Sequence, residues 1–142
     1  MSKGFSLIEL VFVLCIVMAL AAVGVPRLQP FLDRIAADHA AREVTTALAL
    51  ARHGAVLQGI RARLTIADDS LRIDRLEQGG WVPWKRRRGP ADLGVAMAVS
   101  NPVVTFGPTG MGWGVSNTKV VLSRGSQVET ITVSRVGRVK RW

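Results

Sequence analysis

The chain has 142 residues, enough for one small globular domain but too few for two domains and a membrane segment. Its formal net charge is +9, from 19 Lys and Arg against 10 Asp and Glu. This excess points to a polyanionic partner, and it leaves ribosomal, membrane-surface and DNA-binding functions open. The single cysteine, Cys15, excludes an intramolecular disulfide.

The first predicted element is a membrane helix. Between Phe5 and Val25 every residue is apolar or small except Ser6 and Glu9. About 21 helical residues span roughly 32 Å, which is enough to cross a bilayer. A secretory signal peptide is cleaved after its apolar core, whereas the candidate cleavage site here precedes the core.

Glu9 needs a physical explanation, because a carboxylate at mid-bilayer costs about 2.5 to 3.5 kcal/mol. One explanation is a positively charged partner. The alternative is that Glu9, one turn into the helix, reaches the headgroups at little cost. Charge alone does not orient the helix, since Lys3 on one side is opposed by Arg27 and Arg34 on the other.

A second helical segment is predicted from residue 26 to residue 58. Gly24, Pro26 and Pro30 predict a kink or local melting where the chain leaves the lipid. Beyond them, apolar residues recur at spacings typical of an amphipathic helix that packs on a sheet. These residues are Phe31, Leu32, Ile35, Ala36, Ala40, Val44, Ala47, Leu48, Ala51, Ala55 and Val56.

After Gly59 the pattern changes to short β-type runs separated by glycine, proline, Asp and Asn. The predicted strands are 61–67, 71–76, 81–84, 95–99, 103–106, 119–123 and 128–136. A long helix followed only by strands predicts an α+β fold, with the helix packed on an antiparallel β-sheet. The glycine-rich run 107–114 has no strand-to-helix context for phosphate binding and is predicted to be a mobile loop.

The positive charge lies mainly in the C-terminal part of the chain. Ten basic residues face two acidic ones from Gly79 to the end, whereas eight face seven between Arg27 and Gln78. A basic function, if the protein has one, is therefore expected near the C-terminus.

The segment from Lys3 to Leu10 resembles the processing site of prepilins and pseudopilins. The resemblance implies that prepilin peptidase cleaves between Gly4 and Phe5 and that Phe5 is then N-methylated. It also implies that Glu9 acts in filament assembly with other pilins and minor pilins. The subunit would sit in the inner membrane before assembly, as a single-pass protein with its globular domain in the periplasm, and later in or at the tip of an extracellular pilus.

The rest of the chain resembles the GspH and FimT family of minor pilins and pseudopilins. The resemblance is carried by residues 51–56 with 61–66, by 106–110, and by 133–140. It implies the type IV pilin-like fold. The expected organisation is a cleaved leader at 1–4, an assembly helix at 5–25, an amphipathic helix at 26–58 and a β-rich part at 59–142.

The C-terminal tail resembles the Gly-Arg-x-Arg/Lys tail through which some FimT-like proteins bind DNA. In an extended segment Arg138 and Lys140 project to the same side. Contacts to phosphate would be nonspecific and strongly salt-dependent. Trp142 is expected either to stack on an exposed base or to pack on the sheet. The expected DNA-binding residues of the tail are Arg135, Gly137, Arg138, Lys140 and Arg141.

A second basic cluster, Lys85, Arg86, Arg87 and Arg88, precedes a Gly-Pro turn and is predicted to lie in an exposed loop. It is expected either to bind DNA or another polyanion, or to be a solvated loop.

The leading hypothesis is a minor type IV pilin that binds DNA for uptake in natural transformation. The alternative is a type II secretion pseudopilin, or a structural pilus-priming minor pilin, without DNA binding. No catalytic residues, metal ligands or cofactor are predicted, because no general base, nucleophile or Cys/His cluster is visible.

Overall fold

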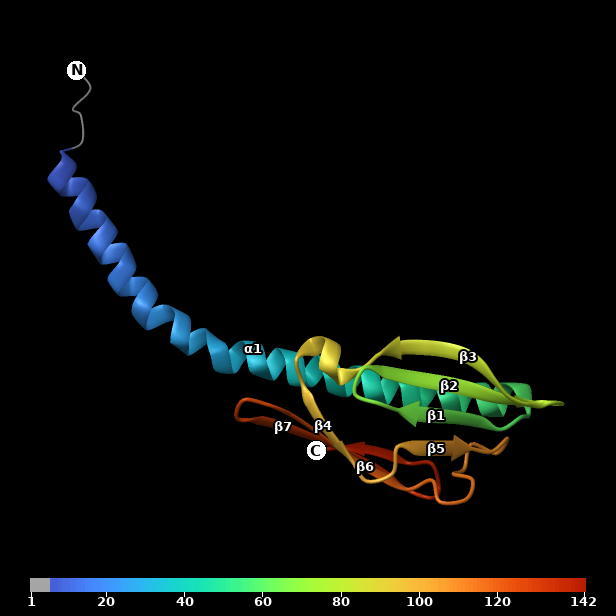
Figure 1. Ribbon diagram of the computed structural model, residues 1–142. Coiled ribbons are helices and arrows are strands. Elements are labelled where there is room, and N and C mark those ends of the chain that lie inside the picture. The colour runs from blue at the N-terminus through green and yellow to red at the C-terminus, as the bar shows by residue number, and fades with distance from the viewer. Residues whose placement is uncertain (1–5) are drawn as a thin grey trace. The chain divides into compact units, whose positions relative to one another are not determined.

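The computed structural model describes residues 6–142, so the expected cleavage site between Gly4 and Phe5 lies outside the described residues. The chain forms two compact units, of which the first ends at Leu32 and the second comprises Asp33–Trp142. One helix, α1 (Leu7–Gln58), belongs to both (Figure 1).

In the first unit, Leu7–Gly24 is long and apolar enough to cross a membrane, with a mean hydropathy of 2.8. None of these residues is buried within the structure, and Glu9 lies in the first turn of the helix. The helix is continuous from Leu7 to Gln58, so the local melting expected around Pro26 and Pro30 does not occur. This segment is consistent with a single-pass membrane anchor.

In the second unit, α1 buries a narrow stripe made mainly of alanine. Small side chains let the helix axis approach the strands closely, and the larger Val44 and Leu48 fill the middle of the contact. The predicted stripe began too early, because Phe31, Leu32 and Ile35 are all more than half exposed, and Val56 is also exposed. The buried stripe is Ala37, Ala40, Ala41, Val44, Ala47, Leu48, Ala51 and Ala55.

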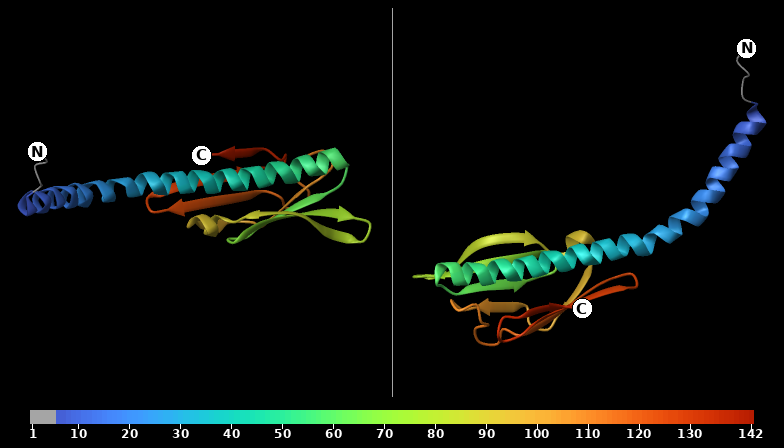
Figure 2. Two further views of the ribbon diagram at one scale, coloured as in Figure 1. Left: turned by 90° about the horizontal axis from the view of Figure 1, so that it is seen from above. Right: turned by 180° about the vertical axis from the view of Figure 1, so that it is seen from behind.

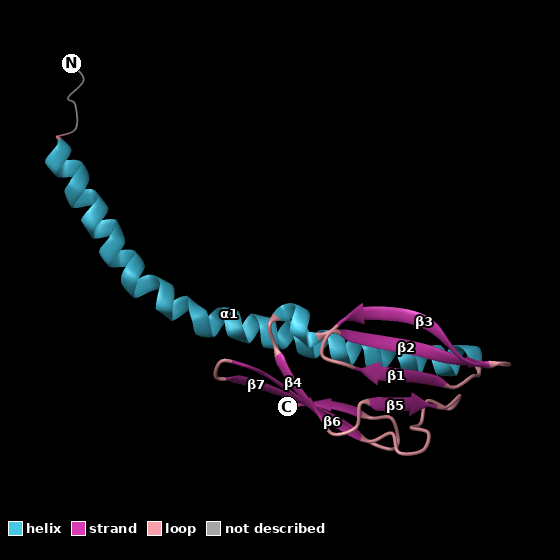
Figure 3. Ribbon diagram, viewed as in Figure 1, coloured by secondary structure: helices cyan, strands magenta, loops and turns pink. Residues whose placement is uncertain are grey.

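Eight strands and one short 3-10 helix, η1, follow the long helix (Figure 3). They are β1 (Ala62–Ile66), β2 (Ser70–Glu77), β3 (Gly80–Arg88), η1 (Pro90–Leu93), β4 (Ala96–Val99), β5 (Val103–Phe106), β6 (Thr118–Arg124), β7 (Gln127–Val133) and β8 (Val139–Arg141). They form two four-stranded sheets rather than the single sheet expected. The first sheet has the order β3-β2-β1-β5 and the second the order β4-β6-β7-β8. All pairings are antiparallel.

Both sheets contribute to one hydrophobic core with α1 (Figure 2). Phe106 is the largest fully buried side chain. In each sheet the alternation along the strands turns one face toward α1 and leaves the other in solvent. The main strand residues of this core are Leu64, Leu71, Ile73, Val104, Phe106, Val120, Leu122, Ile131 and Val133.

One local expectation was wrong, whereas the run 107–114 lies outside the strands, as expected of a loop. Lys85–Arg88 forms the end of β3 and pairs with β2 instead of lying in a loop. The run 107–114 is held by backbone hydrogen bonds, including Gly107 N to Met111 O at 2.8 Å and Trp113 N to Thr105 O at 2.8 Å. These bonds fold the run back along the edge of β5.

Candidate functional site

The last six residues, 137–142, form the C-terminal tail, and Gly137 fixes where it begins. Gly137 has a φ of +75°, a conformation that glycine adopts without strain. A Cβ atom at this position would lie 2.3 Å from the carbonyl oxygen of Gly110. The Gly137 N–H donates to Ser134 O at 2.9 Å. The glycine expected to bind DNA is therefore placed as a structural residue that lets the tail turn against the 107–110 segment.

Strand β8 sorts the tail side chains onto two faces. Lys140 is in register with Thr132 and Arg141 with Ile131 on β7. Because Ile131 is buried against α1, Arg141 points toward the helix and Lys140 points to solvent. Arg138 and Lys140 line one shallow concavity of about 250 Å³ on the solvent side, which supports the expectation that they project together.

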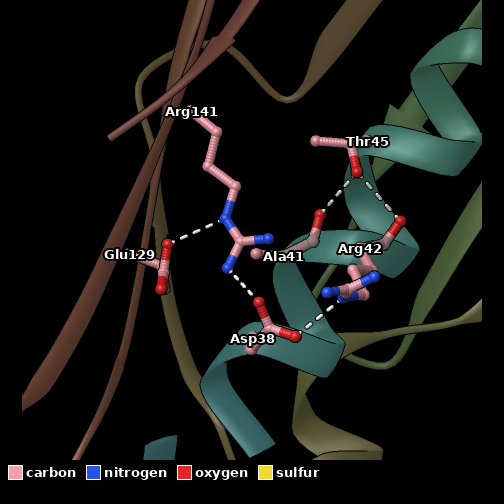
Figure 4. A network of polar contacts seen from close by, with 6 residues as sticks. All are labelled: Asp38, Ala41, Arg42, Thr45, Glu129 and Arg141. Atoms are coloured by element: carbon pink, nitrogen blue, oxygen red, sulfur yellow. Dashed lines mark hydrogen bonds and ion pairs between the residues drawn. The ribbon is translucent and has the colours of Figure 1, made fainter. Parts of the chain in front are cut away.

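Arg141 is engaged by two carboxylates (Figure 4). Its Nε donates to Glu129 Oε2 at 2.9 Å, and its Nη2 donates to Asp38 Oδ1 on α1. The bonds from Arg141 and then Arg42 hold the pKa of Asp38 below its usual range. The bond to Glu129 raises the pKa of Arg141. The Arg141 charge is thus neutralised internally, and this residue anchors β8 to the helix and to β7.

Arg52 on α1 is a residue that the sequence interpretation did not include. Its Nη1 donates to Gly137 O at 3.2 Å, which places an exposed guanidinium beside the start of the tail. Arg52 and Arg138 also line a groove of about 650 Å³ between α1 and the tail. The full lining is Thr45, Leu48, Ala49, Arg52, His53, Val136, Arg138, Val139 and Arg141. The contact spans 85 positions in sequence, so no spacing could have revealed it.

Trp142 does not pack on the sheet. The residue is 67% exposed, and the Lys140 ammonium lies 3.3 Å from the centroid of its ring. This distance is typical of a cation–π contact. The backbone of Trp142 is nevertheless held by β7, since its N–H donates to Thr130 O at 2.9 Å. The tail therefore ends in an ordered backbone with an exposed aromatic ring.

The β3 basic run, Lys85–Arg88, is partly neutralised. Arg87 pairs with Glu43 on α1 at 2.8 Å, and Arg86 pairs with Asp69 at 3.4 Å. Folding therefore brings two carboxylates to this run from elsewhere in the sequence. Lys85 lies 4.8 Å above the Trp84 ring, and Arg88 forms no ion pair within residues 6–142.

Four cations near the start of the tail have no carboxylate partner among residues 6–142. Over the described part of the chain, Arg52, Arg135, Arg138 and Lys140 form no ion pair. Arg135 is exposed in the turn before Gly137, and its carbonyl accepts from Gly112 N at 2.9 Å. Four cations without carboxylate partners therefore lie on neighbouring segments and give this surface a local positive charge.

The apolar start of α1 and the α+β domain built on its second half define a type IV pilin-like subunit. The family model for the Type II transport protein GspH matches residues 40–137, and the chain belongs to this family. The protein is thus a minor pilin or pseudopilin, and its family and fold are those of structural pilins.

Solved structures support the same fold. The type IV minor pilin FimU of Pseudomonas aeruginosa matches with a TM-score of 0.64 and 19% identity, over 78% of this chain and 91% of that chain. The minor pseudopilin EpsH from the Type 2 Secretion System of Vibrio cholerae matches with a TM-score of 0.60 and 16% identity, over 75% of this chain and 95% of that chain. No curated protein sequence matches the chain.

Proposed function

We propose that this subunit is a minor pilin of a type IV pilus that binds DNA without sequence preference and serves DNA uptake. The observation that supports this most directly is the group of Arg52, Arg135, Arg138 and Lys140, which have no carboxylate partners in residues 6–142. Phosphate contacts of this kind carry no sequence information, and they release counterions.

The rest of the proposal concerns assembly. Prepilin peptidase cleaves between Gly4 and Phe5, and Phe5 becomes N-methylated. Glu9 then meets the α-amine of a neighbouring pilin as the subunit leaves the inner membrane, with its globular domain in the periplasm. The apolar Leu7–Gly24 segment supports the membrane stage of this proposal.

Within the proposed DNA site the residues have unequal roles. Arg138 and Lys140 contact phosphate, and Arg52 and Arg135 extend the positive surface on either side. Arg141 and Gly137 hold the tail in place. In the β3 basic run, Lys85 and Arg88 contribute more than Arg86 and Arg87, whose charges are partly neutralised by carboxylates.

The test is DNA binding by the full chain in non-ionic detergent, measured by fluorescence anisotropy with a labelled duplex at several salt concentrations. Replacing Arg138 and Lys140 together with alanine removes about two phosphate contacts. The slope of log K against log salt should then fall by about 1.8. The matched control is the double replacement Arg86→Ala with Arg87→Ala, which removes the same formal charge and should change the slope far less. An unchanged slope in the tail variant would refute the tail as the DNA site.

A second candidate function is a pseudopilin of type II protein secretion, favoured by the GspH family match and by the likeness to EpsH. In this case the basic surface meets acidic partner subunits and has no affinity for DNA. A deletion strain separates the two candidates. Loss of transformation with normal protein secretion supports the pilus, and the opposite result supports the pseudopilus.

A further inference from the structure

The solvent-facing side of the second sheet forms a continuous surface with the tail. Lys119 on β6 is in register with Thr132 on β7, and Thr132 is in register with Lys140 on β8. The three residues therefore form one row across the sheet, with two lysines separated by two strand spacings, or about 10 Å. Thr132 between them is short, and it lines the same concavity as Arg138 and Lys140.

This face carries positive charge without acidic side chains. Glu129 is the only acidic residue in the four fully described strands β4, β6, β7 and β8. Glu129 is in register with the buried Leu122 and pairs with Arg141 on the side of α1. The opposite face therefore holds only hydroxyl, small apolar and basic side chains. Lys119 forms no ion pair within residues 6–142.

Trp142 lies at one corner of the same face. Its backbone exchanges hydrogen bonds with Thr130 at 2.9 and 3.3 Å, which continues the β7–β8 ladder to the last residue. Alternation along β8 places Arg138, Lys140 and Trp142 on one side. The Lys140 ammonium lies over one face of the Trp142 ring. Because 67% of Trp142 is exposed, the ring still has open surface for a flat ligand.

We propose that this face binds single-stranded DNA, with phosphates on Arg138, Lys140 and Lys119 and one base stacked on Trp142. The inference rests on the proposed function and specifies its substrate. Cationic grooves and exposed aromatic rings are the features that hold single strands, since every base has a face to stack. In a duplex the bases are already stacked on one another. A duplex therefore uses the cations but gains nothing from the Trp142 ring.

The experiment uses the full chain in non-ionic detergent, a 20-nucleotide oligothymidine, and a duplex of the same length. Trp142→Leu should weaken binding of the single strand about fivefold or more and change duplex binding less than twofold. Trp142→Phe, which keeps an aromatic ring, should restore most of the affinity for the single strand. Oligothymidine should also quench the protein fluorescence less in the leucine variant than in the wild type.

Lys119 is tested by the salt dependence of single-strand binding. Lys119→Ala should lower the slope of log K against log salt by about 0.7, the value for one phosphate contact on a single strand. Arg34→Ala removes an exposed cation from α1, which is not part of this sheet, and serves as the charge-matched control with no expected change in slope.

The outcomes separate the two proposals. If the wild type binds neither oligonucleotide, the proposed function itself fails. If it binds both, but the leucine variant weakens them equally or not at all, or Lys119→Ala leaves the slope unchanged, the single-strand proposal is overturned and nonspecific DNA binding by the tail stands.

Discussion

Replacing Gly137 with alanine should destabilise the globular unit through two separable effects. The first is backbone strain, because a φ of +75° costs an alanine about 1 to 2 kcal/mol. The second is a collision, because the new Cβ would lie 2.3 Å from Gly110 O. Real contacts of this kind begin near 3.0 Å, so the two segments must separate by about 0.7 Å.

The free-energy cost of this separation can be estimated from the contacts around Gly137. The Arg52 bond to Gly137 O, already 3.2 Å long, would open past hydrogen-bond distance. Its loss, with the displaced packing, adds about 1 to 2 kcal/mol for an exposed charged donor. The total is about 2 to 4 kcal/mol, and the midpoint of thermal unfolding should fall by about 8 to 15 °C.

Gly114 offers a matched control. Its φ is +69°, but a Cβ at this position would meet nothing within 4 Å. Gly114→Ala should therefore show the strain alone, a fall of about 4 to 8 °C. Thermal unfolding of the full chain in detergent, followed by tryptophan fluorescence, measures both variants. Equal falls for the two variants would refute the view that contact with Gly110 fixes the tail.

Two further predictions concern buried or bridging carboxylates. The pKa of Asp38 is lower in the folded state than in the unfolded one, so its stabilising contribution is full above about pH 5 and is lost as pH falls below 3.8. Asp38→Asn should flatten the dependence of the unfolding midpoint on pH between about 5 and 3. The effect on the free energy of unfolding should be below about 1 kcal/mol, because the group is partly exposed. An unchanged pH profile would contradict this prediction. Asp74, 2% exposed, accepts from Arg63 at 2.8 Å and pairs with Arg72 at 3.2 Å. Asp74→Asn should cost about 1 to 3 kcal/mol in denaturant unfolding, whereas the exposed Asp69→Asn should cost less than about 0.5 kcal/mol, and equal costs would contradict the argument.

Local sequence patterns predicted the elements better than their arrangement. The apolar segment before Gly24 and the alanine stripe after Ala37 are visible in sequence, because helix periodicity is a local property. The division into two sheets cannot be seen in the sequence, because it depends on β5 pairing with β1, about 40 positions earlier, rather than with β6. Seven of the eight strands overlap predicted runs, and the missed one, β8, is only three residues long.

The error at Lys85–Arg88 has a specific cause. Four consecutive cations suggest a loop, because charged residues are depleted in strands. β3 is an edge strand of the first sheet, however, and edge strands commonly carry basic residues and proline, which discourage pairing with other chains. Pro83 in the same strand fits this explanation. The basic run thus has a structural reason to exist that is independent of any ligand.

The distribution of charge in the folded protein differs from its distribution in the sequence. Arg86, Arg87, Arg124 and Arg141 all belong to the basic C-terminal part, and each pairs with a carboxylate of the earlier part: Asp69, Glu43, Asp33 and Asp38. The earlier part is nearly neutral in sequence, but several of its carboxylates neutralise arginines of the C-terminal part in the fold. Arg52 on α1 is left without a carboxylate partner in the described chain. Four cations without carboxylate partners in residues 6–142, Arg52, Arg135, Arg138 and Lys140, come together where α1, the 134–138 turn and β8 meet. A total of +9 could not have located this point, and neither could the tail motif alone, since Arg52 reaches it only through the fold.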